Sequence, residues 1–356
     1  MQAAAYTSMD EALEVLSAYG PDLRNGLTSH APMAAEALCA LGRPEAVIPW
    51  VERYRMGMLP RPRARERIAR EHWRGALAQP DRVADWSAFF EEELHAAPWR
   101  EVLDRWAGRL APGICASATH GVIRVGHAVR SLAERGSPRR LHELADGLAY
   151  WAANHQELPT SQHAADHALH PHDAITKVVV VPPERRRFSG TITSSLEALS
   201  EFPDFAPVIG LIDVSGDAPG LVAELTDVFA RVYLANTHDV LTAIVFIHGV
   251  TSVAALGNIL PYLDDATART ALRFAWQAGC GLYAAFGSRP TPAREIESPH
   301  EDADTLVDMA IAHGDEHAIK FTEACLHYYA LNPSPAYLAA ARNALDVLPP
   351  ASTGER

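Results

Sequence analysis

Apolar residues recur every three or four positions along most of the chain, and capping residues separate the runs. In the first run, "SMDEALEVLSAYGP", Ser8 and Glu11 stand at capping-box spacing and a Gly-Pro pair ends the pattern. The second run, "HAPMAAEALCALG", has Pro32 in its first turn and Gly42 just beyond its end. Both runs are typical of amphipathic helices.

The helical pattern continues to the C-terminus. Further helices are predicted from Pro44, Arg63, Asp81 and Pro98, over 117–136, 137–155, 194–202, 221–235, 240–263 and 267–279, and in the C-terminal runs. Alternation with a period of two is scarce, and "TKVVVVPP" at 176–183 is the clearest strand-like run. We therefore predict a mostly α fold, with residues 1–356 forming a single large multi-helix domain.

Two segments stand outside the helical pattern. Residues 155–190 are rich in Pro, His and Arg, and we interpret them as a long functional loop rather than a linker between domains. Residues 347–356 are expected to form a tail.

The segment from Val240 to Leu263 contains no Asp, Glu, Lys or Arg and is long enough to span a bilayer. It also contains Thr, Ser, Asn and His, and no basic residue flanks it closely. We predict that it is the buried central helix of a large soluble bundle.

The composition narrows the choice of partners. Of the 356 residues, 48% are hydrophobic, which is ample for a core. The net charge of −13 argues against nucleic acid and against an anionic membrane surface, because both require basic faces. A soluble protein with a small-molecule partner is the simplest reading.

The four cysteines form no CxxC pair and lie in helix-like apolar contexts: Cys39, Cys115, Cys280 and Cys325. Buried, reduced thiols are expected, which indicates a reducing compartment. The N-terminal residues include early acids and no basic segment, so no signal peptide is predicted. We expect a cytoplasmic protein, and a homodimer is possible.

Histidines are frequent, at 17 in all, and the densest run is "HQELPTSQHAADHALHPHD". Its members are His155, His163, His167, His170 and His172. Their spacings could suit a metal ion. A polar loop of this kind is more often a solvated surface, and we favour that interpretation.

A second group of histidines is spread over the predicted helices. His30 precedes the helix that Pro32 begins, and His120 and His127 are two turns apart on one face. His248 lies in the uncharged helix, where an unpaired polar group would cost about 2–7 kcal/mol. Taken singly, each is more often a core histidine than a ligand.

The stretch "DEHAIKFTEA" adds a lysine to this group. Lys320 is one of two lysines among 31 basic residues, and it shares a helix face with His317, three positions earlier. Gly314 and Asp315 are read as a helix end and a new N-cap, which leaves His313 as a supporting residue at most. A lysine that snorkels to the helix edge, paired with a neighbouring glutamate, would also explain this pattern.

Taken together, "SHAPMAAEALCALGRPEAV", "ATHGVIRVGHAVR", "FIHGVTSVAAL" and "DEHAIKFTEAC" resemble the questin oxidase family, in the same order and over about residues 10–340. The resemblance implies an oxygenase of aromatic polyketides that opens an anthraquinone ring in a Baeyer–Villiger-like outcome. It also implies non-heme iron held by histidines and a lysine that carbon dioxide has carboxylated. The ligands that fall on these motifs are His30, His120, His248, His317 and Lys320, and His127 is an alternative or supporting residue.

The implied chemistry is consistent with the residue types. An apolar environment favours the neutral amine that reacts with carbon dioxide, and the product carbamate is an anionic oxygen ligand. Arginine cannot react in this way because it stays protonated. Fe²⁺ would then be bound by four imidazoles and one carbamate, with dioxygen as co-substrate and an aromatic polyketide as substrate.

Other side chains could contact a flat, phenolic substrate. Arg124, one turn after His120, could pair with a phenolate or with an acidic neighbour. Candidate aromatic walls are Trp106, Trp151, Phe246, Trp276 and Tyr283, although core packing is the commoner role for each.

Three other functions compete with an iron oxygenase. A flavin- or NADPH-dependent monooxygenase is disfavoured because no G-x-G-x-x-G follows a strand. A metal-free protein that binds a polyketide would need none of the proposed ligands. A zinc hydrolase would use the same ligands, since carboxylated lysine and histidine also serve hydrolytic metals.

Overall fold

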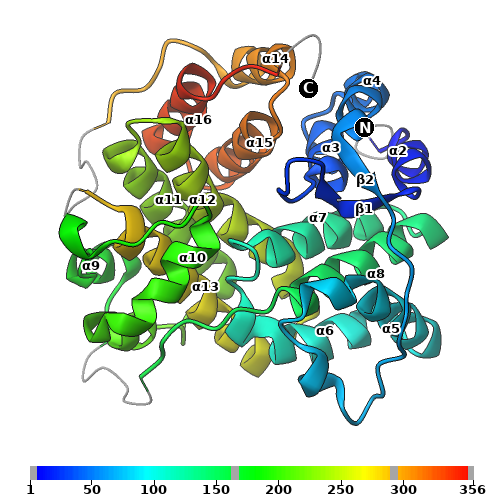
Figure 1. The fold of residues 1–356 in the computed structure, drawn as a ribbon. Helices are drawn as coiled ribbons and strands as arrows, with labels where there is room; N and C mark the ends of the chain where they lie inside the picture. Colours follow the sequence, from blue (N-terminus) through cyan, green and yellow to red (C-terminus); the bar gives the residue numbers. More distant parts are fainter. Residues whose placement is uncertain (1–5, 162–167, 289–295, 352–356) are drawn as a thin grey trace.

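The computed structural model describes residues 6–161, 168–288 and 296–351, which form an assembly of α-helices (Figure 1). The helices are α2 (Met9–Leu16), α3 (Ala31–Ala40), α4 (Pro44–Tyr54), α5 (Val83–Ala96), α6 (Trp99–Leu110), α7 (His120–Glu134), α8 (Pro138–Ala153), α9 (Pro171–Ala174), α10 (Ile192–Glu197), α11 (Ala218–Asn236), α12 (Val240–Ile259), α13 (Asp265–Phe286), α14 (Ala303–His313), α15 (Glu316–Leu331) and α16 (Pro335–Val347). The strands β1 (Tyr19–Leu23) and β2 (Met58–Pro60) pair antiparallel. The predicted mostly α fold is confirmed.

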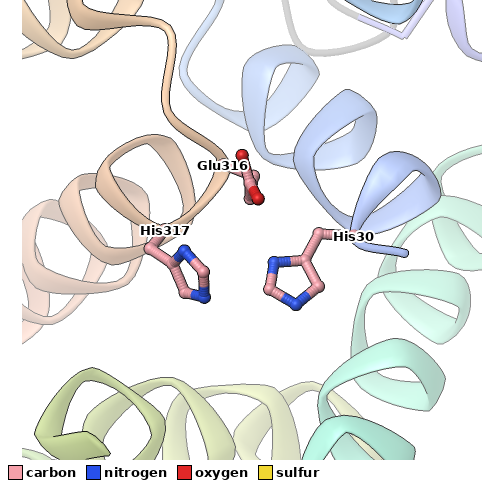
Figure 2. Close-up of side chains that lie close together, drawn as sticks. All are labelled: His30, Glu316 and His317. Carbon is pink, nitrogen blue, oxygen red and sulfur yellow. The ribbon is translucent and has the colours of Figure 1, made fainter. Parts of the chain in front are cut away.

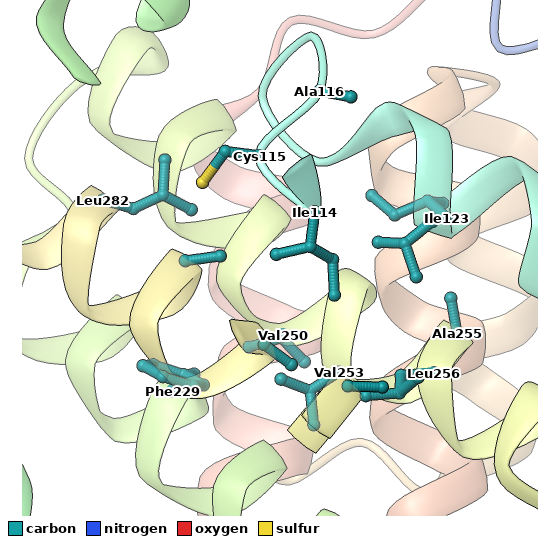
Figure 3. Packing of buried hydrophobic residues seen from close by; sticks show 14 of the residues in the cluster. Ile114, Cys115, Ala116, Ile123, Phe229, Val250, Val253, Ala255, Leu256 and Leu282 are labelled. Carbon is teal, nitrogen blue, oxygen red and sulfur yellow. The ribbon is translucent and has the colours of Figure 1, made fainter. Parts of the chain in front are cut away.

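Helix α12 runs through the middle of the fold and contacts α7, α11, α13 and α15. Asp239 and Thr242 form a capping box that fixes its start. By length and composition the apolar helix could cross a membrane, but 72% of its most apolar 18-residue window is buried inside the protein. The predicted buried central helix is confirmed, and Figure 3 shows Val250, Val253 and Leu256 packed into the main core.

Small residues allow α7 to lie very close to its neighbours. A Cβ on Gly126 would stand 2.3 Å from the backbone oxygen of Ala255 in α12. A Cβ on Gly121 would stand 2.8 Å from Trp151 in α8. Only glycine fits at both positions, and this close approach brings the first turn of α7 to the middle of α12.

The N-terminal elements α2, α3, α4, β1 and β2 share a second, smaller core. Ile319 of α15 belongs to that core, and the Trp50 indole donates a hydrogen bond to the Gly314 carbonyl at 2.8 Å. The start of α15 is therefore fixed against α3 and α4.

The predicted helix boundary at Gly314 and Asp315, between α14 and α15, is confirmed. Gly314 ends α14 in the left-handed conformation, with φ of 74°. Asp315 caps α15, and its carboxylate accepts hydrogen bonds from the backbone of His317 and Ala318.

Three local predictions were wrong. The run from Arg63 forms no α-helix, because the Asp85 carboxylate takes the backbone N–H groups of Arg65 and Glu66 at 2.7 and 3.1 Å. The run at 176–183 forms no strand: its Val181 N–H donates to the carbonyl of Ala284 at the end of α13. The capping box at Ser8 is absent, because its hydroxyl donates to the Pro44 carbonyl instead.

The described part of 155–190 is largely irregular, with α9 and short 3₁₀ turns along it. His163 and His167 lie outside the described residues. The described His170 and His172 face Glu224 and Asp227 of α11, at 3.9 and 3.3 Å. All four cysteines are buried and free, as predicted.

Candidate metal centre

Four histidines that are far apart in the sequence meet where α3, α7 and α15 begin and α12 passes. The Nε2 atoms of His30 and His120 are 2.6 Å apart, and those of His120 and His248 are 3.3 Å apart. The ring centroid of His317 lies 4.5 Å from that of His30 and 5.7 Å from that of His248. We call these four side chains the imidazole cluster.

Backbone carbonyls orient two of the four rings. Nδ1 of His120 donates to the Ser117 carbonyl at 2.5 Å, and Nδ1 of His248 donates to the Ile244 carbonyl at 2.6 Å. A neutral ring that carries its proton on Nδ1 presents a bare lone pair on Nε2. Two bare nitrogens therefore face each other at 3.3 Å, an arrangement that a cation between them would stabilise.

His30 and the first turn of α15 complete this side of the cluster (Figure 2). The Nδ1 of His30 is buried and has no hydrogen-bond partner among the described residues. One nitrogen each of His30 and His317 and a carboxylate oxygen of Glu316 all lie within 4.8 Å of one another. Glu316 was expected only as a salt-bridge partner of Lys320. Its position directly before His317 is the sequence feature that could have marked it as a further candidate ligand.

Burial favours the neutral form of His30, His120 and His248. Burial and the nearby Lys320 charge together lower the pKa of His120 to about 3. The same two causes hold the pKa of His30 and, with help from neighbouring imidazoles, that of His248 well below the usual range. Neutral imidazole is the form that binds a metal ion.

Lys320 lies one turn beyond His317 and is only 2% exposed. Burial lowers the pKa of its amine to about 8, although the charges of Glu316 and Asp315 oppose this shift. About a tenth of the amine is therefore neutral and nucleophilic at pH 7, far more than for a lysine with the usual pKa of about 10.4.

The loop that leads into α7 has an unusual backbone. Ser117, Ala118 and Thr119 have φ values of 47°, 55° and 71°, in the left-handed region that L-residues rarely occupy. Each such residue costs about 1–2 kcal/mol. This turn places the Ser117 carbonyl against the ring of His120. The strained backbone therefore fixes the orientation of one member of the imidazole cluster.

A second cluster lies further along the same helices. Its members are Glu36, His127, Arg130 and Glu323, which we call the charged cluster. Arg130 donates to both carboxylate oxygens of Glu36 at 2.6 and 2.7 Å and to Glu323 at 2.5 Å. The Nδ1 of His127 lies 2.6 Å from Glu36. The structure thus places His127, considered as an alternative ligand, with this carboxylate and not among the four imidazoles.

A groove of about 390 Å³ opens between the N-terminal elements and α7 and α8. Ser29 and Arg124 line it, one residue from His30 and one turn from His120, and Met58 adds an apolar surface. The Arg124 guanidinium donates to both oxygens of Glu143 at 2.6 and 2.8 Å. Of the two partners considered for Arg124, the structure shows the acidic neighbour, and a contact with a phenolate stays a prediction.

The remaining candidates lie elsewhere. His313 faces the Leu348 carbonyl at 3.0 Å, away from the cluster. The five aromatic candidates all belong to the main core: Trp106, Trp151, Phe246, Trp276 and Tyr283. The indole of Trp106 donates to Glu93, and those of Trp151 and Trp276 donate to backbone carbonyls. Core packing is the role that the structure shows for them.

The donor set suits a transition metal. Nitrogen ligands about 2.1 Å from one ion are about 3.0 Å apart at a right angle and about 3.4 Å apart in a tetrahedron. The 3.3 Å between His120 and His248 lies between these values, whereas the 2.6 Å between His30 and His120 is shorter and is a hydrogen-bond distance. Imidazole suits iron, zinc, copper and nickel, so the histidines alone do not select the metal.

Comparison with known proteins adds a family to this geometry. No curated protein matches the sequence. A family model described as Questin oxidase-like matches residues 29–325, which is most of the chain and includes all four imidazoles and Lys320. The matched order of motifs agrees with the resemblance in the sequence, and the chain belongs to the questin oxidase-like family.

Proposed function

We propose that this protein is an iron-dependent oxygenase that uses dioxygen to oxidise and open a ring of an aromatic polyketide. The observation that carries the proposal is the convergence of four buried imidazoles beside a buried lysine. The family description supports oxidation as the type of reaction.

The residues that would hold the iron are His30, His120, His248 and His317, with Lys320 as the anionic ligand after carboxylation. Four neutral imidazoles leave the charge of Fe²⁺ uncompensated, and a carbamate would balance half of it. Glu316 is a second source of negative charge on the same face. Bound iron would supply the redox chemistry by which dioxygen oxidises an electron-rich ring.

The protein's own groups would bind and orient the substrate. The groove of about 390 Å³ lies within the range of about 300–1,000 Å³ for small-molecule sites, and it reaches residues adjacent to His30. Its lining combines apolar side chains with Arg61 and Arg124, which are paired with Asp146 and Glu143 and could orient a phenolic oxygen. Burial of the imidazoles excludes bulk water from the reacting atoms.

Metal analysis of protein purified without oxygen tests the proposal. We expect one iron per chain. Stoichiometric zinc would indicate a hydrolase, and absence of any metal would indicate a protein that only binds a polyketide. A yellow protein would indicate a flavin enzyme. Replacement of His170 and His172 by Ala should leave the iron content unchanged, because these residues lie on the 155–190 segment.

The anionic ligand is tested at Lys320. Both Lys320→Ala and Lys320→Arg are expected to lose iron retention and turnover, and small carboxylates should partly restore Lys320→Ala. Full activity of either variant would exclude the carbamate. Loss of iron in Glu316→Gln with an unaffected Lys320→Ala would assign the anionic role to Glu316.

A further inference from the structure

Lys320 lines a second, much smaller cavity of about 10 Å³. Arg130 and His127 of α7 form one wall, and Thr251 of α12 lies deep within it. Asn258 and His327 are more exposed and lie at its mouth. Among the described residues, the groove and this cavity have no lining residue in common, so they are two separate spaces beside the centre.

Size separates the molecules that the two spaces admit. A volume of about 10 Å³ holds about one water molecule, and no ring system can enter it. The groove is about forty times larger by the same measure, from 390 and 10 Å³. The cavity beside Lys320 can therefore serve only a very small molecule.

The lining favours a small molecule with hydrogen-bond acceptors. Arg130 is held in place by Glu36 and Glu323, and Asn258 adds a side-chain amide, whereas the Thr251 hydroxyl donates to the Ile247 carbonyl at 2.9 Å. Dioxygen has little affinity for such donors, whereas both oxygens of carbon dioxide accept hydrogen bonds. Because Lys320 is 2% exposed, its amine needs a defined path from solvent before it can react.

We propose that this cavity is the route by which carbon dioxide reaches Lys320. This inference rests on the proposed function, which requires a carboxylated lysine. The neutral amine nitrogen of Lys320 attacks the carbon of carbon dioxide and forms the N–C bond, while one C=O electron pair moves onto oxygen. The displaced N–H proton leaves to water at the mouth, and nothing is oxidised or reduced.

The location of the cavity has a consequence for the order in which Lys320 is carboxylated and the substrate binds. Its lining residues on α7, α12 and α15 all follow the imidazole cluster along their helices. Carbon dioxide can therefore arrive from the charged cluster without passing through the groove. Lysine carboxylation would proceed even while a substrate occupies the groove.

The test is to close the mouth without touching Lys320. Ala254→Phe and Asn258→Phe replace partly exposed lining residues on α12. Ala330→Phe is the matched control, because it adds the same side chain at an exposed position of α15 outside the cavity. Protein freed of carbon dioxide is returned to ¹³C-bicarbonate, and the ¹³C-carbamate signal and iron uptake are followed over time in folded protein.

We expect both cavity variants to form the carbamate at least about tenfold more slowly and to reach the same final extent, with Ala330→Phe unchanged. Equal rates in all variants would overturn the route alone. Slower use of dioxygen with normal carbamate formation would assign the cavity to dioxygen and also overturn the route. Absence of any carbamate in the unsubstituted protein would overturn the proposed ligand and the route together.

Discussion

The imidazole cluster and the charged cluster share three helices and occupy two levels along them, and α12 adds His248 to the imidazole cluster alone. His30 caps α3 and Glu36 lies within it, α7 supplies His120, His127 and Arg130, and α15 supplies His317 and Glu323. The second level lies about 9–15 Å further along each helix, at about 1.5 Å per residue. Lys320 stands between the two levels.

The two levels differ in whether their polar groups are satisfied. In the charged cluster, Arg130 bridges two carboxylates and His127 faces one of them, so each charge has a partner. In the imidazole cluster, bare nitrogens of His120 and His248 face each other, and Nδ1 of His30 has no partner in the described part of the chain. The charged cluster therefore holds the helices together, and the imidazole cluster is the one that we propose to be completed by a metal ion.

Removal of Arg130 should give the largest effect on stability. Arg130→Met leaves the buried Glu36 and Glu323 without their common partner, which we expect to cost about 3–5 kcal/mol of the free energy of unfolding. Urea denaturation of the metal-free protein measures this loss. A loss below about 1 kcal/mol would contradict the structural role of the charged cluster.

His248→Leu tests the other level. The substitution is expected to lower iron affinity at least about a hundredfold, while the stability of the metal-free protein stays within about 1 kcal/mol, because leucine suits the apolar surroundings of α12. Metal titration and urea denaturation give the two numbers. A large loss of apoprotein stability with normal iron affinity would reverse the assignment of the two levels.

Acid should weaken the charged cluster. Burial raises the pKa of Glu36, but Arg130 and His127 outweigh it and lower the pKa from 4.5 to about 2. The folded state thus binds this proton less readily than the unfolded state, so the contribution is complete above about pH 4.5 and disappears as pH falls towards 2. We expect a change on the order of 3 kcal/mol, measured by urea denaturation between about pH 5 and pH 2. The stability of Glu36→Gln should lack this pH dependence. If Glu36→Gln and the unsubstituted protein lose stability equally between about pH 5 and pH 2, Glu36 is not the source of the change.

The smallest expected effect concerns the left-handed turn before His120. Ala118→Gly removes a strained side chain, and after the entropy that glycine gains in the unfolded state the apoprotein should gain about 0.5–1 kcal/mol. Iron affinity should fall a few-fold, because the Ser117 carbonyl holds His120 less firmly. Ala116→Gly, just outside the left-handed residues, is the control and should show neither the gain nor the fall.

The helices and the family could be predicted because their signals are local. Gly314 and Asp315 mark a helix boundary by their own conformations, and the absence of charge in α12 marks it as buried. The antiparallel pairing of β1 and β2 could not be predicted, because the strands are short, lack alternation and are separated by more than thirty residues. The run from Arg63 failed for a similar reason, since the distant Asp85 carboxylate decides its conformation.

The candidate site shows the same division. The spacing of His317 and Lys320 placed both on one face, but their meeting with His30, His120 and His248 depends on how four helices pack. The partner of His127 is Glu36, 91 residues earlier, and no local pattern connects them. The four histidines could be predicted to lie together only from their resemblance to the family motifs, because helix packing cannot be inferred from the local sequence pattern.

The contact between Gly126 and the backbone of Ala255 has a consequence for mutational surveys. Any side chain at position 126 must push α7 away from α12, because a backbone oxygen cannot move aside. His120 and His248 sit on these two helices, and a misplacement of about 1 Å in a catalytic group can reduce a rate about a hundredfold. Gly126→Ala would therefore be scored as an active-site mutation although its methyl group touches no ligand. At position 126, intolerance of a side chain would therefore report the spacing of α7 and α12 and not a contact with the reacting groups.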